Sequence, residues 1–140
     1  MGGPLSDIVD RVNALGMKFG IWIEPEMVNE DSDLFRSHPD WAFTIPGRKP
    51  VRGRNQLVLD YSRPEVVDAV FDQISCVLDS ANIEYIKMDM NRSINDVYSV
   101  GLARQSYGKT MHNYVKGVYA FLDRLQKRYP DLLTEEADVK

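Results

Sequence analysis

The sequence predicts an α/β fold, in which about four parallel strands are joined by helical crossovers within a single segment over residues 1–140. Two observations carry this prediction. Stretches in which apolar residues recur at helical spacing alternate with short β-branched or aromatic runs, and this alternation is typical of parallel sheets. The composition, 44% apolar and 27% charged, is that of an ordinary globular domain and excludes a disordered or collagen-like chain.

The first elements are a helix and a strand. Apolar residues follow helical spacing between Pro4 and Gly16, which are typical start and stop residues. The run Met17–Ile23 is short, aromatic and β-branched, as expected of a strand. Residues 24–56 are mixed and rich in proline, and they predict only a short helix near Asp31–Ser37.

The second half of the chain predicts strands that alternate with helices. Ser62 and Glu65 have the spacing of a capping box, which indicates a helix start. Pro130 ends the last helix, since proline cannot continue the helical hydrogen bonds. The expected elements are, in order, a strand at Leu57–Leu59, a helix through 66–78, a strand at Tyr85–Asp89, a helix over roughly Gly108–Tyr129 and a strand that begins at Asp131–Leu133.

Two of these strands are expected to share one apolar and one polar face. Side chains alternate between the two faces of a strand. Trp22 and Glu24 therefore share one face of the first strand, and Tyr85, Lys87 and Asp89 share one face of the later strand at Tyr85–Asp89. A parallel strand covered by helices on both faces is usually apolar throughout. The polar face therefore indicates a ligand cleft or a barrel interior. A small doubly wound sheet and half of a (β/α)8 barrel both fit the length, since a complete barrel takes about 250 residues.

Lys87 and Asp89 are the candidates for chemistry on the polar face. A nearby ammonium favours the ionised carboxylate, which a nucleophile needs at neutral pH. Carboxylates, an arginine and a tryptophan around a cleft are also the groups with which proteins hold sugars. A structural ion pair between Lys87 and Asp89 is the alternative, and the pattern alone leaves both open.

Charge and composition disfavour several other classes. The net charge of −4 argues against a nucleic-acid partner. The single Cys76 cannot form an internal disulfide, so we expect a reducing, cytoplasmic location. No apolar run is long enough to predict a membrane span. His38 and His112 lack metal-ligand spacing and no glycine-rich nucleotide string occurs, so we expect neither a metal nor a cofactor.

Three strings stand in order along the chain: GIWIEPEMV at Gly20–Val28, SHPDW at Ser37–Trp41 and YIKMDMNR at Tyr85–Arg92. Together they resemble the bacterial α-galactosidases of glycoside hydrolase family 36, over about Leu5 to Glu135. The resemblance implies part of that family's catalytic (β/α)8 barrel, also called a TIM barrel. It further implies a retaining hydrolase whose substrates are α-galactoside sugars such as melibiose and raffinose.

The resemblance also implies roles for single residues. Asp89 matches the nucleophile in the family's Lys-x-Asp-x-Asn string. The substrate-binding side chains of the family carry over onto Lys87, Trp22, Arg54 and Asn91.

The family has further catalytic aspartates, and the resemblance implies that they would lie before Met1 and beyond Lys140. The resemblance also implies that Ala137 occupies a position where the family has a cysteine. A retaining glycosidase needs two carboxyl groups about 5–5.5 Å apart. Loss of the general acid typically costs about 10²–10⁴-fold. We therefore expect the isolated chain, a fragment, to be inactive. A non-catalytic sugar-binding module and a half-barrel that forms a homo-oligomer through its open sheet edges remain alternatives.

Overall fold

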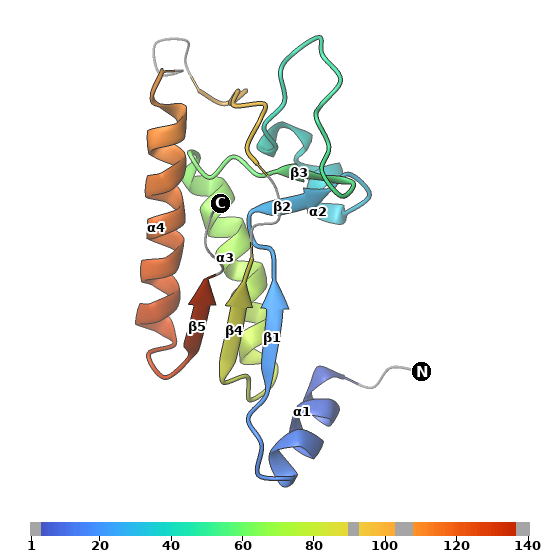
Figure 1. Cartoon of the computed structure of the whole chain (residues 1–140), viewed down its shortest axis with the longest axis vertical. Coiled ribbons are helices and arrows are strands. Elements are labelled where there is room, and N and C mark those ends of the chain that lie inside the picture. The colour runs from blue at the N-terminus through green and yellow to red at the C-terminus, as the bar shows by residue number, and fades with distance from the viewer. Residues whose placement is uncertain (1–3, 90–92, 103–107, 137–140) are drawn as a thin grey trace.

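The computed structural model describes residues 4–89, 93–102 and 108–136. Its centre is a three-stranded parallel sheet in the order β1-β4-β5 (Figure 1). The strands are β1 Gly20–Ile23, β4 Tyr85–Met88 and β5 Leu133–Glu136. The chain reaches β4 through helix α3 and β5 through helix α4, which span Pro64–Asp79 and Thr110–Arg128. The predicted α/β class with helical crossovers is therefore confirmed.

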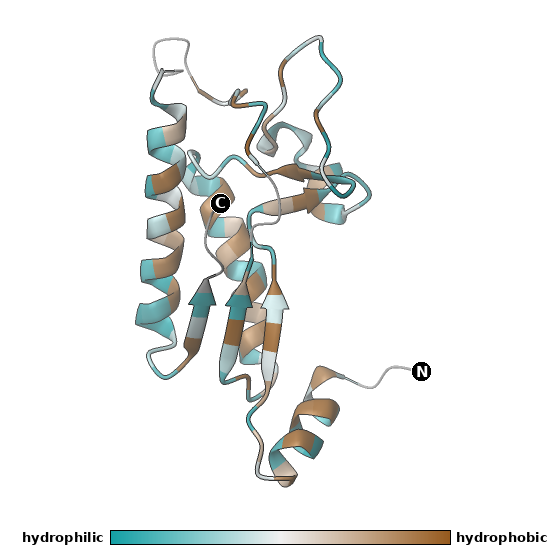
Figure 2. Cartoon of the chain, in the orientation of Figure 1, coloured by the Kyte–Doolittle hydropathy of each residue, from teal (hydrophilic) through white to brown (hydrophobic). Residues whose placement is uncertain are grey.

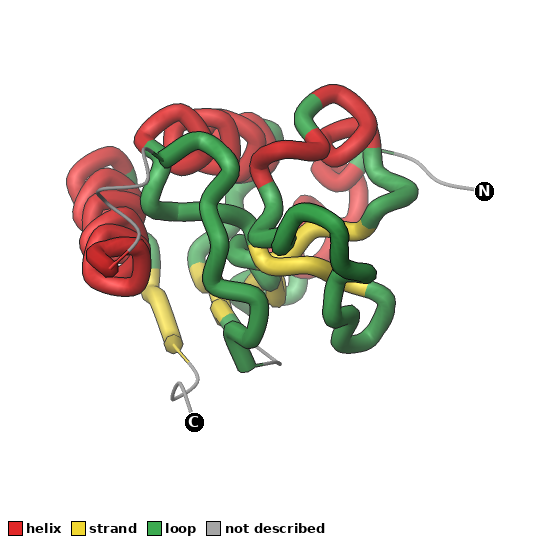
Figure 3. Tube along the Cα trace, turned by 90° about the horizontal axis from the view of Figure 1, so that it is seen from above, coloured by secondary structure: helices red, strands yellow, loops and turns green. Residues whose placement is uncertain are grey.

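Both long helices lie on the same side of the parallel sheet, as the view from above shows (Figure 3). Ile86 and Met88 of the central strand β4 face these helices and are buried, with exposed fractions of 0% and 4%. Ile21 and Ile23 of β1 are partly buried and pack against the same core. The opposite face of the sheet has no helix over it among the described residues. The polar side chains expected from the alternation lie on this uncovered face.

A second, smaller sheet corrects the predicted strand count. β2 (Met27–Asn29) and β3 (Gln56–Val58) pair antiparallel, with Val28 opposite Leu57. The predicted fourth parallel strand at Leu57–Leu59 is wrong in this respect, because its residues belong to the antiparallel pair. A short buried apolar run looks the same in both kinds of sheet, so periodicity could not separate them. The pair lies beyond the carboxyl ends of the parallel strands, near α2 (Asp33–Ser37) and the 3₁₀ turn Pro39–Trp41 (Figure 1).

The helix starts agree with the sequence in one case and differ in another. Helix α1 (Leu5–Ala14) follows Pro4 and ends before Gly16, whose φ of 76° suits glycine. The capping box predicted for α3 does not form. Ser62 donates its hydroxyl to Asp60 instead, and Glu65 pairs with Arg63 at 2.8 Å.

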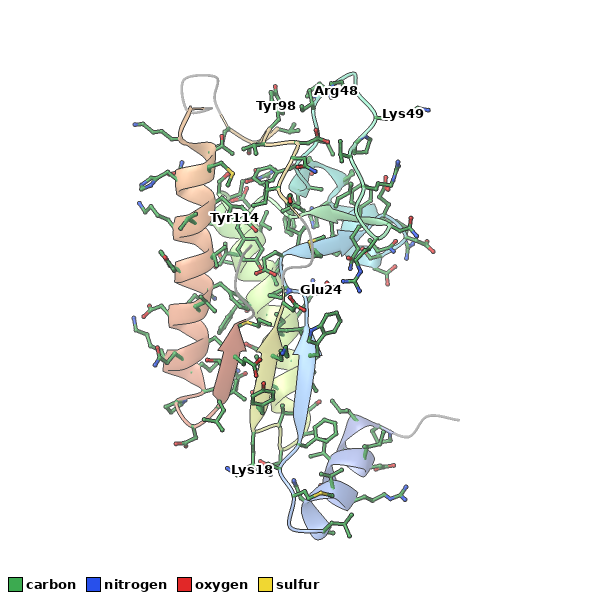
Figure 4. The ribbon with its side chains drawn as sticks, viewed as in Figure 1. Lys18, Glu24, Arg48, Lys49, Tyr98 and Tyr114 are labelled. Atoms are coloured by element: carbon green, nitrogen blue, oxygen red, sulfur yellow. The ribbon has the colours of Figure 1, made fainter. Side chains whose placement is uncertain are left out.

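Helix α4 docks on the start of α3 through aromatic side chains. Tyr114 points from α4 toward the interior (Figure 4), and its ring centroid lies 5.9 Å from that of Tyr61. Phe121 packs edge-on against both Tyr61 and Phe71. A Cβ at Gly117 would overlap the carbonyl oxygen of Tyr61, so this approach of the backbones requires glycine. In Figure 2 α4 alternates hydrophilic and hydrophobic bands, as expected of an amphipathic helix.

None of the helices in the described part of the chain is both long enough and apolar enough to cross a bilayer.

Candidate active site

One row of side chains crosses all three parallel strands on the uncovered face. In the register of the sheet, Trp22 of β1 is paired with Lys87 of β4, and Lys87 is paired with Glu135 of β5. Neighbouring strands lie about 4.8 Å apart, so the three side chains are direct neighbours. Trp22 is 49% exposed, although tryptophan is usually well buried. The sheet thus offers an aromatic surface next to a charged pair.

The next row begins where the strands end. The Asp89 amide donates to the Ile23 carbonyl at 3.1 Å, so the parallel pairing continues past β4. This pairing sets Asp89 level with Glu24. Glu24 is the residue that follows β1 (Figure 4). Asp89 is two residues after Lys87 and Glu24 is two after Trp22, so all four share one face. The carboxyl ends of parallel strands are where α/β proteins usually place their active sites.

Lys87 forms its ion pair with Glu135, not with Asp89. The Lys87 ammonium lies 2.7 Å from a Glu135 carboxylate oxygen, and the Tyr85 hydroxyl donates to the same carboxylate. The hydrogen bond with Glu135 raises the pKa of Lys87, and the same bond lowers the pKa of Glu135. The Lys87–Asp89 ion pair considered from the sequence is therefore replaced by a Lys87–Glu135 pair. Lys87 is held charged beside Asp89.

Gly20 makes room for Tyr85 in this cluster. A Cβ at residue 20 would lie 2.6 Å from the Tyr85 ring, which is closer than atoms pack. The Tyr85 ring occupies the space over Gly20, and its hydroxyl reaches Glu135 from there. The glycine thereby supports the Lys87–Glu135 pair from the neighbouring strand.

Arg54 reaches the site from the turn before β3. Its guanidinium donates to Glu24 at 3.0 Å, and Gln56 donates to the other Glu24 oxygen at 3.2 Å. Arg54 and Asn55 both have left-handed backbone conformations, with φ of 53° and 61°. Gly53 and Gln56 exchange backbone hydrogen bonds across them, which closes a tight two-residue turn. The turn brings Arg54 to the end of β1, although 30 residues separate Arg54 from Glu24.

Two further acidic residues near the strand ends have structural roles. Asp60 is fully buried and accepts hydrogen bonds from the hydroxyls of Ser62 and Ser99. Asp96 accepts a bond of 2.8 Å from the Val51 amide. The Ser99–Asp60 bond fastens residues 93–102 to the segment after β3, and the Asp96–Val51 bond fastens them to the loop before it. Asp60 has no exposed surface through which to reach a ligand.

The structure brings together four of the five predicted site residues: Trp22, Lys87 and Asp89 on adjacent strands, and Arg54 through Glu24. The fifth, Asn91, lies outside the described residues. Within the described ranges no group of three or more acidic, histidine or cysteine side chains could hold a metal ion.

The sequence did not predict the cation partner of Glu24 or of Glu135. The alternation put Glu24 on the polar face with Trp22, and Glu135 follows the predicted start of the final strand, so these positions were the available signal. Which cation each would meet depends on the strand register and on the turn at Arg54, and neither can be read from periodicity.

Comparison with known proteins now identifies the family. The melibiase family model matches residues 1–138. The chain belongs to the melibiase family. The bifunctional alpha-galactosidase/sucrose kinase AgaSK of Mediterraneibacter gnavus is 60% identical over 135 residues, which are 96% of this chain and 14% of that protein. The chain thus spans about a seventh of that relative's length.

Solved structures agree with this assignment. The glycoside hydrolase family 36 α-galactosidase AgaB of Geobacillus stearothermophilus superimposes with a TM-score of 0.92 at 46% identity, over 95% of this chain and 18% of that one. A variant of α-galactosidase AgaA from the same organism, solved in complex with raffinose, gives a TM-score of 0.91 at 45% identity, over 94% of this chain and 18% of that one. The relatives of this chain are therefore family 36 α-galactosidases, as the three sequence strings indicated.

Proposed function

We propose that these residues form the nucleophile-bearing part of the galactosyl site of a retaining α-galactosidase, within a (β/α)8 barrel. The observation that carries the proposal is the position of Asp89 at the carboxyl end of β4, on the face that also holds Trp22 and Lys87. Family membership supports the reaction class. The raffinose complex of a relative supports oligosaccharides that end in an α-galactosyl unit as the substrate class.

In the proposed reaction the Asp89 carboxylate attacks the anomeric carbon of the galactosyl unit. The bond to the leaving sugar breaks, its oxygen takes a proton from a general acid, and a covalent galactosyl-enzyme forms. Water, deprotonated by the same acid/base group, then attacks the anomeric carbon and releases galactose with retained configuration. The Lys87 ammonium and Arg54 guanidinium donate hydrogen bonds to sugar hydroxyls, and the Trp22 ring packs against the sugar ring.

The general acid is not assigned to either carboxylate next to Asp89. Glu24 already accepts hydrogen bonds on both of its oxygens from Arg54 and Gln56. Glu135 accepts from Lys87 and Tyr85, which keeps its pKa low and its carboxylate ionised. An ionised Glu135 carboxylate has no proton to give to a leaving sugar, and both Glu24 oxygens are engaged by donors from the protein. The proposal therefore includes that the 140-residue chain does not hydrolyse α-galactosides by itself.

Activity is best tested in a grafted enzyme, in which residues 5–135 replace the matching segment of the Mediterraneibacter gnavus relative. The 60% identity over this region makes the graft conservative. We expect the graft to hydrolyse raffinose and an aryl α-galactoside, and the 140-residue chain to hydrolyse neither. Asp89→Asn in the graft should lower kcat by about 10⁴-fold or more, as removal of a nucleophile does.

The control is Asp31→Asn, which changes an exposed aspartate that pairs with Arg36 away from the sheet. Its kcat should equal that of the parent graft. Retained activity in the Asp89→Asn graft would overturn the proposed role of Asp89. Turnover by the 140-residue chain alone would overturn the proposed need for a further carboxyl group.

A further inference from the structure

Arg54 is held by more than an ordinary surface ion pair. The Glu24 side chain that it contacts is only 9% exposed, whereas the Arg54 side chain is 56% exposed. The two ends of this contact therefore differ: the carboxylate is fixed in the protein, and the guanidinium extends from it toward solvent. A guanidinium has five N–H donors, so the bond to Glu24 leaves others for a ligand.

The backbone at Arg54 is also unusual. A left-handed conformation is disfavoured at residues other than glycine, because the Cβ crowds the following carbonyl oxygen. Asn55 tolerates it well, because asparagine is among the residues enriched there, but arginine has no such preference. Glycine at residue 54 would give the same turn without this cost. The chain therefore has an arginine at a position where the backbone favours another residue, and such strain often marks a functional site.

A matched ion pair close by shows what an ordinary contact looks like. Arg52, two residues before Arg54, donates to Glu30 at 3.0 Å. Both side chains of this pair are accessible: Arg52 is 47% exposed and Glu30 is 33% exposed. Exposed pairs of this kind contribute little to stability. The Arg54–Glu24 contact differs in the burial of its carboxylate and in its position level with Asp89.

We propose that Glu24 is a positioning residue, whose buried carboxylate holds the Arg54 guanidinium at the carboxyl end of β1, where it meets the galactosyl unit beside Asp89. This inference rests on the proposed function and adds a residue to it. Gln56 contributes by donating to the second Glu24 oxygen, which fixes the plane of the carboxylate. The hairpin before β3 is thereby fastened to the parallel sheet at the point where the sugar would bind.

The test is a double-mutant cycle in the grafted enzyme. Glu24→Gln keeps the shape of the side chain and removes its charge, and it should raise the KM for raffinose about tenfold, as loss of a charged hydrogen bond does. Arg54 is proposed to bind the sugar in the ground state and the transition state alike, so kcat should change less than about twofold. In an Arg54→Ala background, Glu24→Gln should raise KM by less than about twofold, because its partner is already absent.

The matched control is Glu30→Gln, which breaks the accessible Arg52 pair and should leave KM and kcat unchanged. Effects of Glu24→Gln and Arg54→Ala that multiply, or an unchanged KM in Glu24→Gln, would overturn the positioning role. If either outcome occurs while Asp89→Asn abolishes activity in the same graft, the positioning role of Glu24 is overturned and the proposed function is not. Activity that survives Asp89→Asn would overturn the proposed function first.

A second readout needs no turnover. In nitrogen-15 NMR spectra of the 140-residue chain, the Arg54 guanidinium should show slow rotation, and in Glu24→Gln it should rotate freely. The Arg52 guanidinium should be unaffected by Glu24→Gln. Free rotation of Arg54 in the unsubstituted chain would contradict the positioning role.

Discussion

The two faces of the parallel sheet are built from the same strands and follow different rules. On the helix-covered face, Ile86 and Met88 are buried and contact other apolar side chains. On the uncovered face, Lys87 and Glu135 are held by specific hydrogen bonds, and Trp22 is half exposed. The covered face stabilises the fold through apolar volume. On the uncovered face, ion pairs and hydrogen bonds hold the polar side chains in position. The stability of the fold should therefore respond differently to substitutions on the two faces.

The largest difference in stability should come from single truncations on the two faces. Ile86→Ala should lower the free energy of unfolding by about 3 kcal/mol, since it leaves a cavity in a closed core. Trp22→Ala removes a larger side chain but an exposed one, so it should cost less than about 1 kcal/mol. Denaturant unfolding of both variants measures the contrast. Equal losses would show that the two faces do not differ in the way described.

A glycine pair tests the helix layer that covers the sheet. Gly117→Ala should lower the free energy of unfolding by about 2 kcal/mol, because the new methyl overlaps the Tyr61 carbonyl. Helix propensity alone would favour alanine by about 1 kcal/mol. Gly108→Ala, where a Cβ has open space, is the control and should not destabilise the chain. Thermal melts of the two variants measure the effect, and a stabilised Gly117→Ala variant would contradict the close helix approach.

The Lys87–Glu135 pair predicts a pH dependence on the uncovered face. The lowered pKa of Glu135 means that its contribution is complete above the ordinary value of 4.5 and is lost as pH falls through the lowered value. The raised pKa of Lys87 means that its contribution is complete below 10.5 and is lost as pH rises through the raised value. An NMR titration of the Glu135 carboxyl carbon checks the acid limb. Lys87→Met should move the Glu135 midpoint up, and a midpoint above 4.5 in the unsubstituted chain would contradict the pair.

The smallest expected effect lies at the turn that presents Arg54. Asn55→Gly relieves the left-handed backbone at residue 55 and should stabilise the fold by about 0.5 kcal/mol. It leaves the Arg54–Glu24 contact intact, so the KM of the grafted enzyme should not change. Unfolding midpoints and KM values, measured side by side, separate the two effects. A raised KM would show that Asn55 itself takes part in binding.

The sequence predicted the two faces correctly because alternation along a strand depends only on local geometry. Trp22, Lys87 and Asp89 were assigned to the polar face, and the structure places them there, with Ile86 and Met88 buried on the other face. The final strand was also expected from the residues after Pro130, and it forms as β5.

The errors came from interactions between distant residues. The antiparallel pairing of β2 with β3 joins segments about 30 residues apart, and no local sequence pattern predicts it. An ion pair of Lys87 with Asp89 was one of the two interpretations that the sequence left open, whereas the sheet register offers Lys87 the carboxylate of Glu135. The capping box at Ser62 failed because buried Asp60 takes the Ser62 hydroxyl. The cytoplasmic location and the homo-oligomer stay predictions.

The central claim is that Asp89 is the nucleophile, and covalent trapping tests it most directly. The grafted enzyme would be incubated with an α-galactosyl fluoride that carries a second fluorine on its ring, a substitution that slows hydrolysis of the galactosyl-enzyme. Peptide mass spectrometry would then locate the label. We predict one fluorogalactosyl group on Asp89 and none after Asp89→Asn. A label on any other carboxylate, Glu24 or Glu135 included, would contradict it.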